Sequence, residues 1–156
     1  MKAQPSPKKK SDLRLQLAVN RSARSPDQIS AARLRRVARA ALRAAARHGT
    51  FAVSLAFVSA AAMRRLNRRY AGHDYVTDVL SFPAQEQMPP SRVRLLGDVV
   101  ICLPQAERQA KAAGQPLWRE VDWLLAHGVL HLLGYDHASA REASQMRALE
   151  RKALQL

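Results

Sequence analysis

The chain has 156 residues, of which 47% are hydrophobic, and this suits one globular domain with a single core. No apolar run approaches the ~20 residues needed to cross a bilayer, so we do not expect a membrane protein. A single cysteine, Cys102, excludes an internal disulfide framework and fits a reducing compartment, which predicts a cytoplasmic protein.

The net charge of +14 is concentrated near the N-terminus. Residues 1–50 carry 13 Lys and Arg against two Asp, whereas residues 51–156 carry 13 against 10 acidic residues. Such asymmetry favours a polyanionic partner, because neutralised phosphates release condensed counterions. We interpret it as a sign of nucleic-acid binding, although a solvated basic face or an anionic membrane surface would also account for it.

The first fifty residues predict three segments. Residues 1–10 (MKAQPSPKKK) have nothing to bury, so we predict a disordered basic arm followed by one domain over residues 11–156. Residues 12–19 alternate leucine or valine with other residues, which indicates a half-buried strand. Ser25 and Pro26 offer an N-cap and a proline at the first helical position, which predicts a helix from there to about Arg47.

This predicted helix has an arginine face opposite its apolar face. The arginines that recur every four residues are Arg35, Arg39, Arg43 and Arg47. Like charges at this spacing repel and weaken a helix by a few tenths of a kcal/mol per pair. A row of arginines that lowers helix stability is better explained by an anionic partner than by a need for solubility. We therefore predict that these arginines bind nucleic acid.

The remaining segments complete the order β-α-β-α-β-β-α-α-α. Strands are predicted over 50–58, 78–82 and 95–103, with a helix from about 59 to 70 between the first two. Helices are predicted over 104–113, 116–133 and about 139–154. This order favours one sheet with helices packed on it.

Three of the five histidines lie in residues 127–137, HGVLHLLGYDH. Residues four apart share a helix face, so His127 and His131 place two imidazoles side by side. Gly134 can end the helix at positive φ and turn His137 back toward them. Three neutral imidazoles suit Zn²⁺, so we predict one zinc ion per chain with these three ligands. Histidine nitrogen also binds Ni²⁺ and Cu²⁺, and the alternative is that each histidine is an ordinary core or cap residue.

Three protein ligands leave one tetrahedral position for water, as in catalytic zinc sites, where the metal lowers the pKa of that water to around 7. Metalloprotease helices read H-E-x-x-H, with the glutamate as general base, but Gly128 occupies that position here. Asp136 is the carboxylate nearest in sequence. It is a candidate catalytic base and equally a candidate for orienting a histidine ring by a hydrogen bond.

The motif HGVLHLLGYDH closely resembles the H-G-x-L-H-L-x-G-Y-D-H signature of the bacterial endoribonuclease YbeY family, and the resemblance continues in LNRRYAGHDYVTDVLSFP and LGDVVICLPQA. It implies a single α+β domain with a mixed, roughly four-stranded sheet packed with about five helices. It also implies a zinc-dependent, single-strand-specific endoribonuclease. Such an enzyme would act on ribosomal RNA and the small ribosomal subunit, in 16S rRNA 3′-end maturation and ribosome quality control.

The chain departs from the family pattern at one position. The family reads L-N-x-x-Y-R-G-x-D, with an arginine regarded as important for activity, whereas this chain has Ala71 there. Two interpretations follow: either Arg68 or Arg69, one turn back, reaches the same place, or the nuclease activity is weakened or lost. Arg69 is the candidate catalytic residue, and Arg68 is a candidate RNA contact. The resemblance also places Thr77, Asp78 and Ser81 near the metal cleft.

Two rival functions follow from these features. A non-catalytic, zinc-containing rRNA-binding assembly factor is favoured by Ala71, because a missing cation weakens transition-state stabilisation. A different metallohydrolase, such as a peptidase, is disfavoured by Gly128 and by the charge of +14. Trp118 and Trp123 are interpreted as core residues rather than base-stacking platforms, because they lie on a helix with several leucines and only 5% of the residues are aromatic.

Overall fold

A computed structural model of the chain describes residues 12–21, 29–86 and 91–155. The predicted basic arm at 1–10 and the predicted cap at 25–26 lie outside these residues. No helix within the described ranges has the length and apolar content needed to cross a membrane. The elements are β1 (Arg14–Arg21), α1 (Ala31–Ala44), β2 (Thr50–Val58), α2 (Ala60–Ala71), β3 (Val79–Pro83), β4 (Val93–Cys102), α3 (Leu103–Ala112), α4 (Leu117–Leu132) and α5 (Ala140–Leu154).

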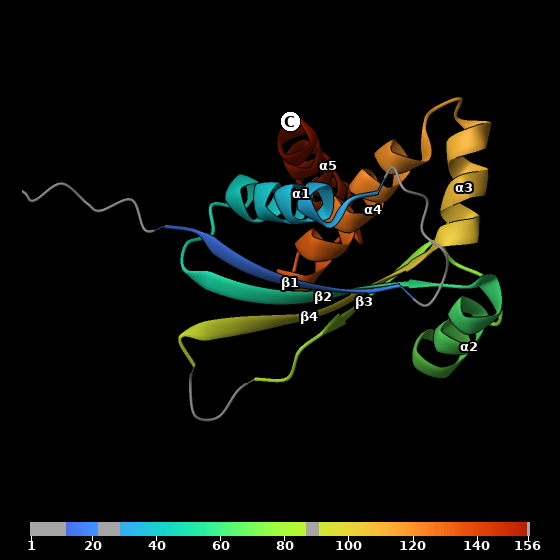
Figure 1. The fold of residues 1–156 in the computed structure, drawn as a ribbon, viewed down its shortest axis with the longest axis horizontal. Coiled ribbons are helices and arrows are strands. Elements are labelled where there is room, and N and C mark those ends of the chain that lie inside the picture. The colour runs from blue at the N-terminus through green and yellow to red at the C-terminus, as the bar shows by residue number, and fades with distance from the viewer. Residues whose placement is uncertain (1–11, 22–28, 87–90, 156) are drawn as a thin grey trace, which may run out of the picture.

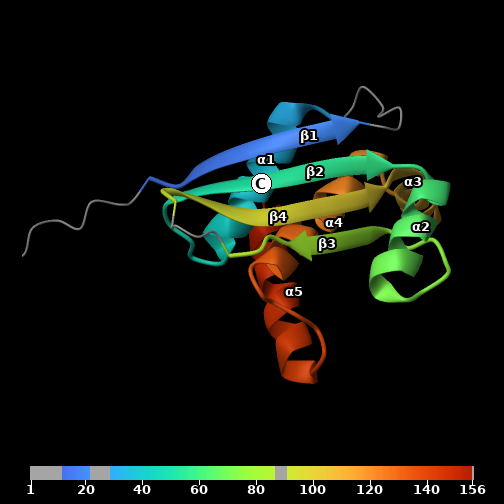
Figure 2. The same ribbon diagram turned by 90° about the horizontal axis from the view of Figure 1, so that it is seen from below.

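The four strands form one mixed sheet in the order β1-β2-β4-β3 (Figure 2). β1, β2 and β4 run parallel, and β3 pairs antiparallel with β4 at the edge. The element order and the α+β class, with a mixed sheet and five helices among the described residues, confirm the prediction.

The two faces of the sheet are covered unequally. Helices α1, α4 and α5 lie over one face, and α2 lies on the other side (Figure 1). On β2, Phe51, Val53 and Leu55 point into the larger core, as period-two alternation requires. Val58 and Cys102 belong to a smaller cluster with residues of α2. Burial of Cys102 confirms its interpretation as a small core residue.

Helix α1 begins later than predicted. Its N-cap is Ser30, whose hydroxyl accepts a hydrogen bond from the backbone N–H of Arg33. Ile29, just before the cap, is buried, so packing selects this start over the one suggested by Ser25 and Pro26. At the other end the helix stops at Ala44, because Ala46 adopts a left-handed conformation with φ 53°.

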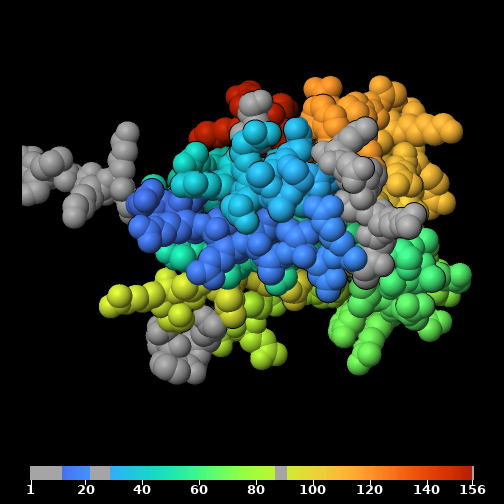
Figure 3. All heavy atoms as spheres, viewed as in Figure 1, coloured from blue at the N-terminus to red at the C-terminus, as the bar shows by residue number. Residues whose placement is uncertain are grey.

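The arginine stripe of α1 is divided by its surroundings. Arg35 and Arg43 are exposed, whereas Arg39 and Arg47 are half-buried. Arg39 Nη2 donates to the backbone carbonyl of Leu13 at 2.8 Å, so it ties α1 to the start of β1. In Figure 3, α1 (light blue) and β1 (blue) lie together on one face, and α2 (green) protrudes at its lower right end. The arginines of α1 and Arg68 of α2 therefore come from separate parts of the surface.

A partly buried ion pair joins α1 to α4. The Arg33 guanidinium donates to both carboxylate oxygens of Asp122, with a shortest distance of 2.6 Å, and also lies 4.0 Å from the centre of the Trp118 ring. Burial raises the pKa of Asp122, and the hydrogen bonds from Arg33 oppose that rise. The ion pair thus offsets the free-energy cost of burying the Asp122 carboxylate between the helices.

We expect Arg33→Ala to lower the free energy of unfolding by about 3 kcal/mol, because Asp122 would be left buried without its cation. Urea denaturation would measure this, with Arg35→Ala as an exposed matched control on the same helix. The double variant Arg33→Met with Asp122→Leu should recover most of the loss, because it removes both charges. Equal stability of the two single variants would contradict a stabilising role for the pair.

Candidate metal centre

The three motif histidines converge at the C-terminal end of α4. His127 and His131 lie one turn apart on this helix, with ring centres 4.6 Å apart. After Leu132 the chain turns at Gly134, where φ is 94°, and the N–H of Tyr135 bonds back to the carbonyl of Leu130. The turn brings His137 back, so that its ring centre lies 5.8 Å from that of His127 and 5.3 Å from that of His131.

The histidine nitrogens have the spacing of a metal site. One ligand atom from each of His127, His131 and His137 lies within 4.8 Å of the other two, and the two Nε2 atoms of the helix pair are 3.1 Å apart. Tetrahedral zinc with Zn–N bonds of 2.0–2.1 Å would hold two nitrogens about 3.3 Å apart. Burial and then the neighbouring histidines lower the pKa of His131, which favours the neutral form that binds a metal. The residues fit a zinc ion.

A buried carboxylate from α5 supports the first of these ligands. Glu150 Oε1 lies 2.6 Å from His127 Nδ1, and the Glu150 side chain is 8% exposed. A carboxylate accepts hydrogen bonds, so the ring proton sits on Nδ1 and the Nε2 lone pair faces the cluster. Sequence reasoning missed Glu150. The available signal was its spacing on α5, where it shares a face with Ala143, Met146 and Arg147.

Gly128 lets α4 approach the sheet closely. A Cβ at this position would lie 2.6 Å from a Val99 methyl group and 3.2 Å from Ser81 Oγ. The Ser81 hydroxyl also donates to the Gly128 carbonyl at 3.1 Å, which joins β3 to α4. A glutamate has no room here, so this packing explains why the protease base is absent.

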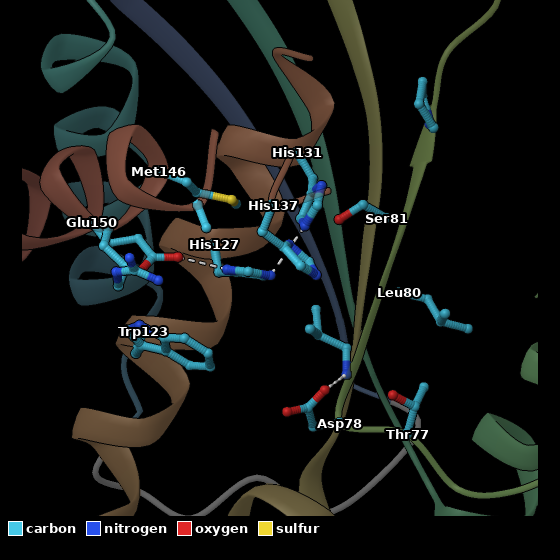
Figure 4. A pocket seen from close by; sticks show the side chains of 14 residues that line it. Thr77, Asp78, Leu80, Ser81, Trp123, His127, His131, His137, Met146 and Glu150 are labelled. Carbon is cyan, nitrogen blue, oxygen red and sulfur yellow. Dashed lines mark hydrogen bonds and ion pairs between the residues drawn. The ribbon is translucent and has the colours of Figure 1, made fainter. Parts of the chain in front are cut away.

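An open cleft of about 810 Å³ lies beside the histidines. Helices α4 and α5 form one wall and β3 with its preceding loop forms the other (Figure 4). Thr77, Asp78 and Ser81 line it, in the place expected from the family resemblance. Asp78 is held by the N–H of Val79 at 2.7 Å and by the Gln109 amide at 3.2 Å.

The two catalytic candidates from sequence lie outside the lining of this cleft. Asp136 is exposed, accepts the backbone N–H of His137 at 2.7 Å, and approaches His137 Nδ1 to 3.7 Å, which suits an orienting role. Arg68 and Arg69 are exposed on α2, and Arg69 lies over the ring of Tyr70. Among the described residues, the arginine that lines the cleft is Arg147 of α5, which sequence reasoning missed.

The two tryptophans have different surroundings. Trp118 packs against the core and under Arg33, as interpreted from the sequence. Trp123 is 36% exposed and lines the cleft, so its assignment to the core was wrong. Its indole stacks on the His127 ring, with centres 5.1 Å apart and planes 28° from parallel.

The comparisons with known proteins agree with the histidine motif. The family profile described as Endoribonuclease YbeY matches residues 19–156. The chain belongs to the YbeY family. Endoribonuclease YbeY of Alkalilimnicola ehrlichii is 44% identical over 146 residues, which cover 92% of this chain and 85% of the relative. Endoribonuclease YbeY of Moorella thermoacetica is 45% identical over 128 residues, covering 78% and 82%.

A solved structure supports the fold. The solution structure of TM1509 from Thermotoga maritima has a TM-score of 0.53 and 21% identity, and the match covers 91% of this chain and 89% of that one. The resemblance drawn from the three sequence motifs is confirmed, and it places the chain in a family of proteins named as RNA-cleaving enzymes.

We expect Gly128→Ala to destabilise the protein by about 1–3 kcal/mol, because the new methyl group would push α4 away from Val99. Thermal denaturation would measure this, and Gly114→Ala, where a Cβ meets nothing within 4 Å but φ is 62°, separates crowding from backbone strain. Wild-type stability of Gly128→Ala would show that the helix–sheet contact is looser than the structure indicates.

Glu150→Ala should weaken zinc affinity by 10–100-fold, because His127 loses the partner that orients its ring. Glu150→Gln should fall between this variant and the wild type, since its amide oxygen still accepts from Nδ1. Competition with a chromophoric chelator would measure the affinity, and Glu107→Ala, an exposed carboxylate on α3, is the matched control. Unchanged affinity in Glu150→Ala would exclude the orienting role.

Proposed function

We propose that this protein is a zinc-dependent, single-strand-specific endoribonuclease of the cytoplasm. Its substrate is ribosomal RNA, and its role is 16S rRNA 3′-end maturation and ribosome quality control on the small ribosomal subunit. The observation that carries the proposal is the set of three histidine nitrogens within 4.8 Å, at the wall of an open cleft, in a member of the YbeY family. The charge of +14 supports a polyanionic substrate.

In this proposal His127, His131 and His137 hold the zinc ion. When bound, the metal supplies Lewis-acid polarisation of a phosphoryl oxygen and a lowered pKa for water. Glu150 fixes the proton on His127 Nδ1, and Asp136 supports catalysis by orienting His137. The wall formed by β3 and its preceding loop would face the RNA backbone across the cleft from the histidines.

The arginines outside the cleft hold the rest of the RNA. Arg35 and Arg43 present exposed guanidinium groups on α1, which lies on the same side of the sheet as α4 and α5 (Figure 1). Arg39 and Arg47 contribute through the parts of their side chains that remain accessible. Arg68 and Arg69 belong to α2, so in this proposal they contact a different part of the substrate. Arg69 is the weaker catalytic candidate, because it lies on α2, whereas Asp136 lies directly against the candidate ligand His137.

The alternative function is a non-catalytic, zinc-containing rRNA-binding assembly factor. Two observations favour it: Ala71 occupies the position where the family pattern has an arginine, and neither Arg68 nor Arg69 lines the cleft. In that case the metal would chiefly order the connection between α4 and α5, and RNA would bind without being cut.

Cleavage of an rRNA fragment with a single-stranded 3′ tail would test the proposal. Wild-type protein and His131→Ala, purified in parallel, would be compared at low and moderate salt. We expect cleavage by the wild type alone, and weaker cleavage as salt rises, because phosphate contacts are screened. Equal cleavage by both proteins would indicate a contaminating nuclease and contradict the catalytic proposal. Binding without cleavage by the wild type would support the assembly factor instead.

A further inference from the structure

A second hollow adjoins the metal cleft along α5. It has a volume of about 390 Å³ and is lined by Trp123, Arg147, Glu150, Arg151, Leu154 and Gln155. Trp123, Arg147 and Glu150 also line the metal cleft, so the two hollows share a boundary made of these side chains. A chain that passes from one hollow to the other must therefore run past Trp123 and Arg147.

Trp123 has the environment of a stacking surface. It lies on α4 beside fully buried residues such as Leu124 and Leu125, yet more than a third of it is exposed. The His127 ring lies stacked against the indole, and Figure 4 shows the indole beside that ring, extending toward the open cleft. A large exposed aromatic ring held in place by a neighbour is preorganised to accept a second ring.

Two cations beside this ring form no ion pair with the part of the chain that the structure describes. Arg147 and Arg151 are four residues apart on α5, both are exposed, and neither forms an ion pair with another described residue. The one carboxylate that lines both hollows belongs to Glu150, and it is bound to His127. The edge of the hollow therefore stays positively charged and suits phosphate.

We propose that Trp123 and Arg147 form a nucleotide-binding subsite, in which one nucleobase stacks on the indole and the adjoining phosphate binds the guanidinium. Arg151 binds the next phosphate along the second hollow. The inference rests on the RNA-binding part of the proposed function and deepens it. A base can reach the indole only when it is unpaired, so this subsite selects single-stranded RNA.

Binding of a fluorescein-labelled 2′-O-methyl RNA octamer to the zinc-loaded protein tests the subsite, with gel analysis to verify that the octamer stays intact. Trp123→Leu should bind at least about 10-fold more weakly, because leucine keeps apolar volume but offers no π face, and Trp123→Phe should retain most of the affinity. An octamer that consists only of abasic nucleotides should bind the wild type and Trp123→Leu equally. Zinc content is measured for each variant, because Trp123 contacts His127.

Arg147→Gln tests the phosphate contact independently. It should weaken binding and reduce the slope of log affinity against log salt by about 0.7, the value expected for one contact to a single strand. Arg141→Gln is the matched control, since Arg141 is exposed on α5 but lines neither hollow. A slope for Arg147→Gln equal to that of Arg141→Gln would overturn the assignment of Arg147.

The subsite is overturned if zinc-loaded Trp123→Leu binds the base-containing octamer as tightly as the wild type does. Such a result together with wild-type rRNA cleavage would leave the nuclease proposal intact. The opposite pattern, binding that depends on Trp123 and Arg147 without cleavage, would support the subsite and place it on a non-catalytic RNA-binding protein.

Discussion

The metal centre depends on the close approach of α4 to the sheet at Gly128. Because this residue has no side chain, the Val99 methyl groups and the Ser81 hydroxyl reach the helix directly. His127 precedes this contact by one residue and His131 follows it by three, so both rings are held at a fixed height above β3. Backbone packing thus sets the depth of the cleft. A helix with a glutamate at this position could not approach the sheet as closely.

Both helices that flank the third ligand have well-defined ends. His137 lies in the short connection between the turn at Gly134 and the N-cap of α5, where Ser139 and Glu142 form a reciprocal capping box. The hydrogen bond between His127 and Glu150 then fastens α5 against α4 further along. The three ligands are consequently positioned by local turn chemistry at one end and by a buried charged contact at the other.

The parts of the candidate metal site that the sequence predicts are those that lie within one short segment. The three histidines and the turning glycine lie within 127–137, so helical spacing brings His127 and His131 together and the turn at Gly134 adds His137. The spacing on α5 puts Glu150 on one face with Met146, but its contact with His127 and the exposure of Trp123 depend on how α5 packs against α4, which no local pattern specifies. The prediction of where α1 begins was wrong for a related reason. Ser25 and Ser30 are both acceptable caps by residue type, but in the structure Ser30 caps the helix, directly after the buried Ile29.

Arg147, the arginine that lines the cleft, bears on the absence of an arginine at Ala71, where the family pattern has one. An arginine at the end of α2 would act from an element separate from the histidines, whereas Arg147 belongs to the helix that also carries Glu150. They are three positions apart on α5, so the cation that would face the substrate in the proposed function and the carboxylate that contacts the candidate ligand His127 share one rigid support. In the proposed function, any displacement of α5 would therefore change metal geometry and phosphate binding together, so the α4–α5 contact would couple binding to chemistry.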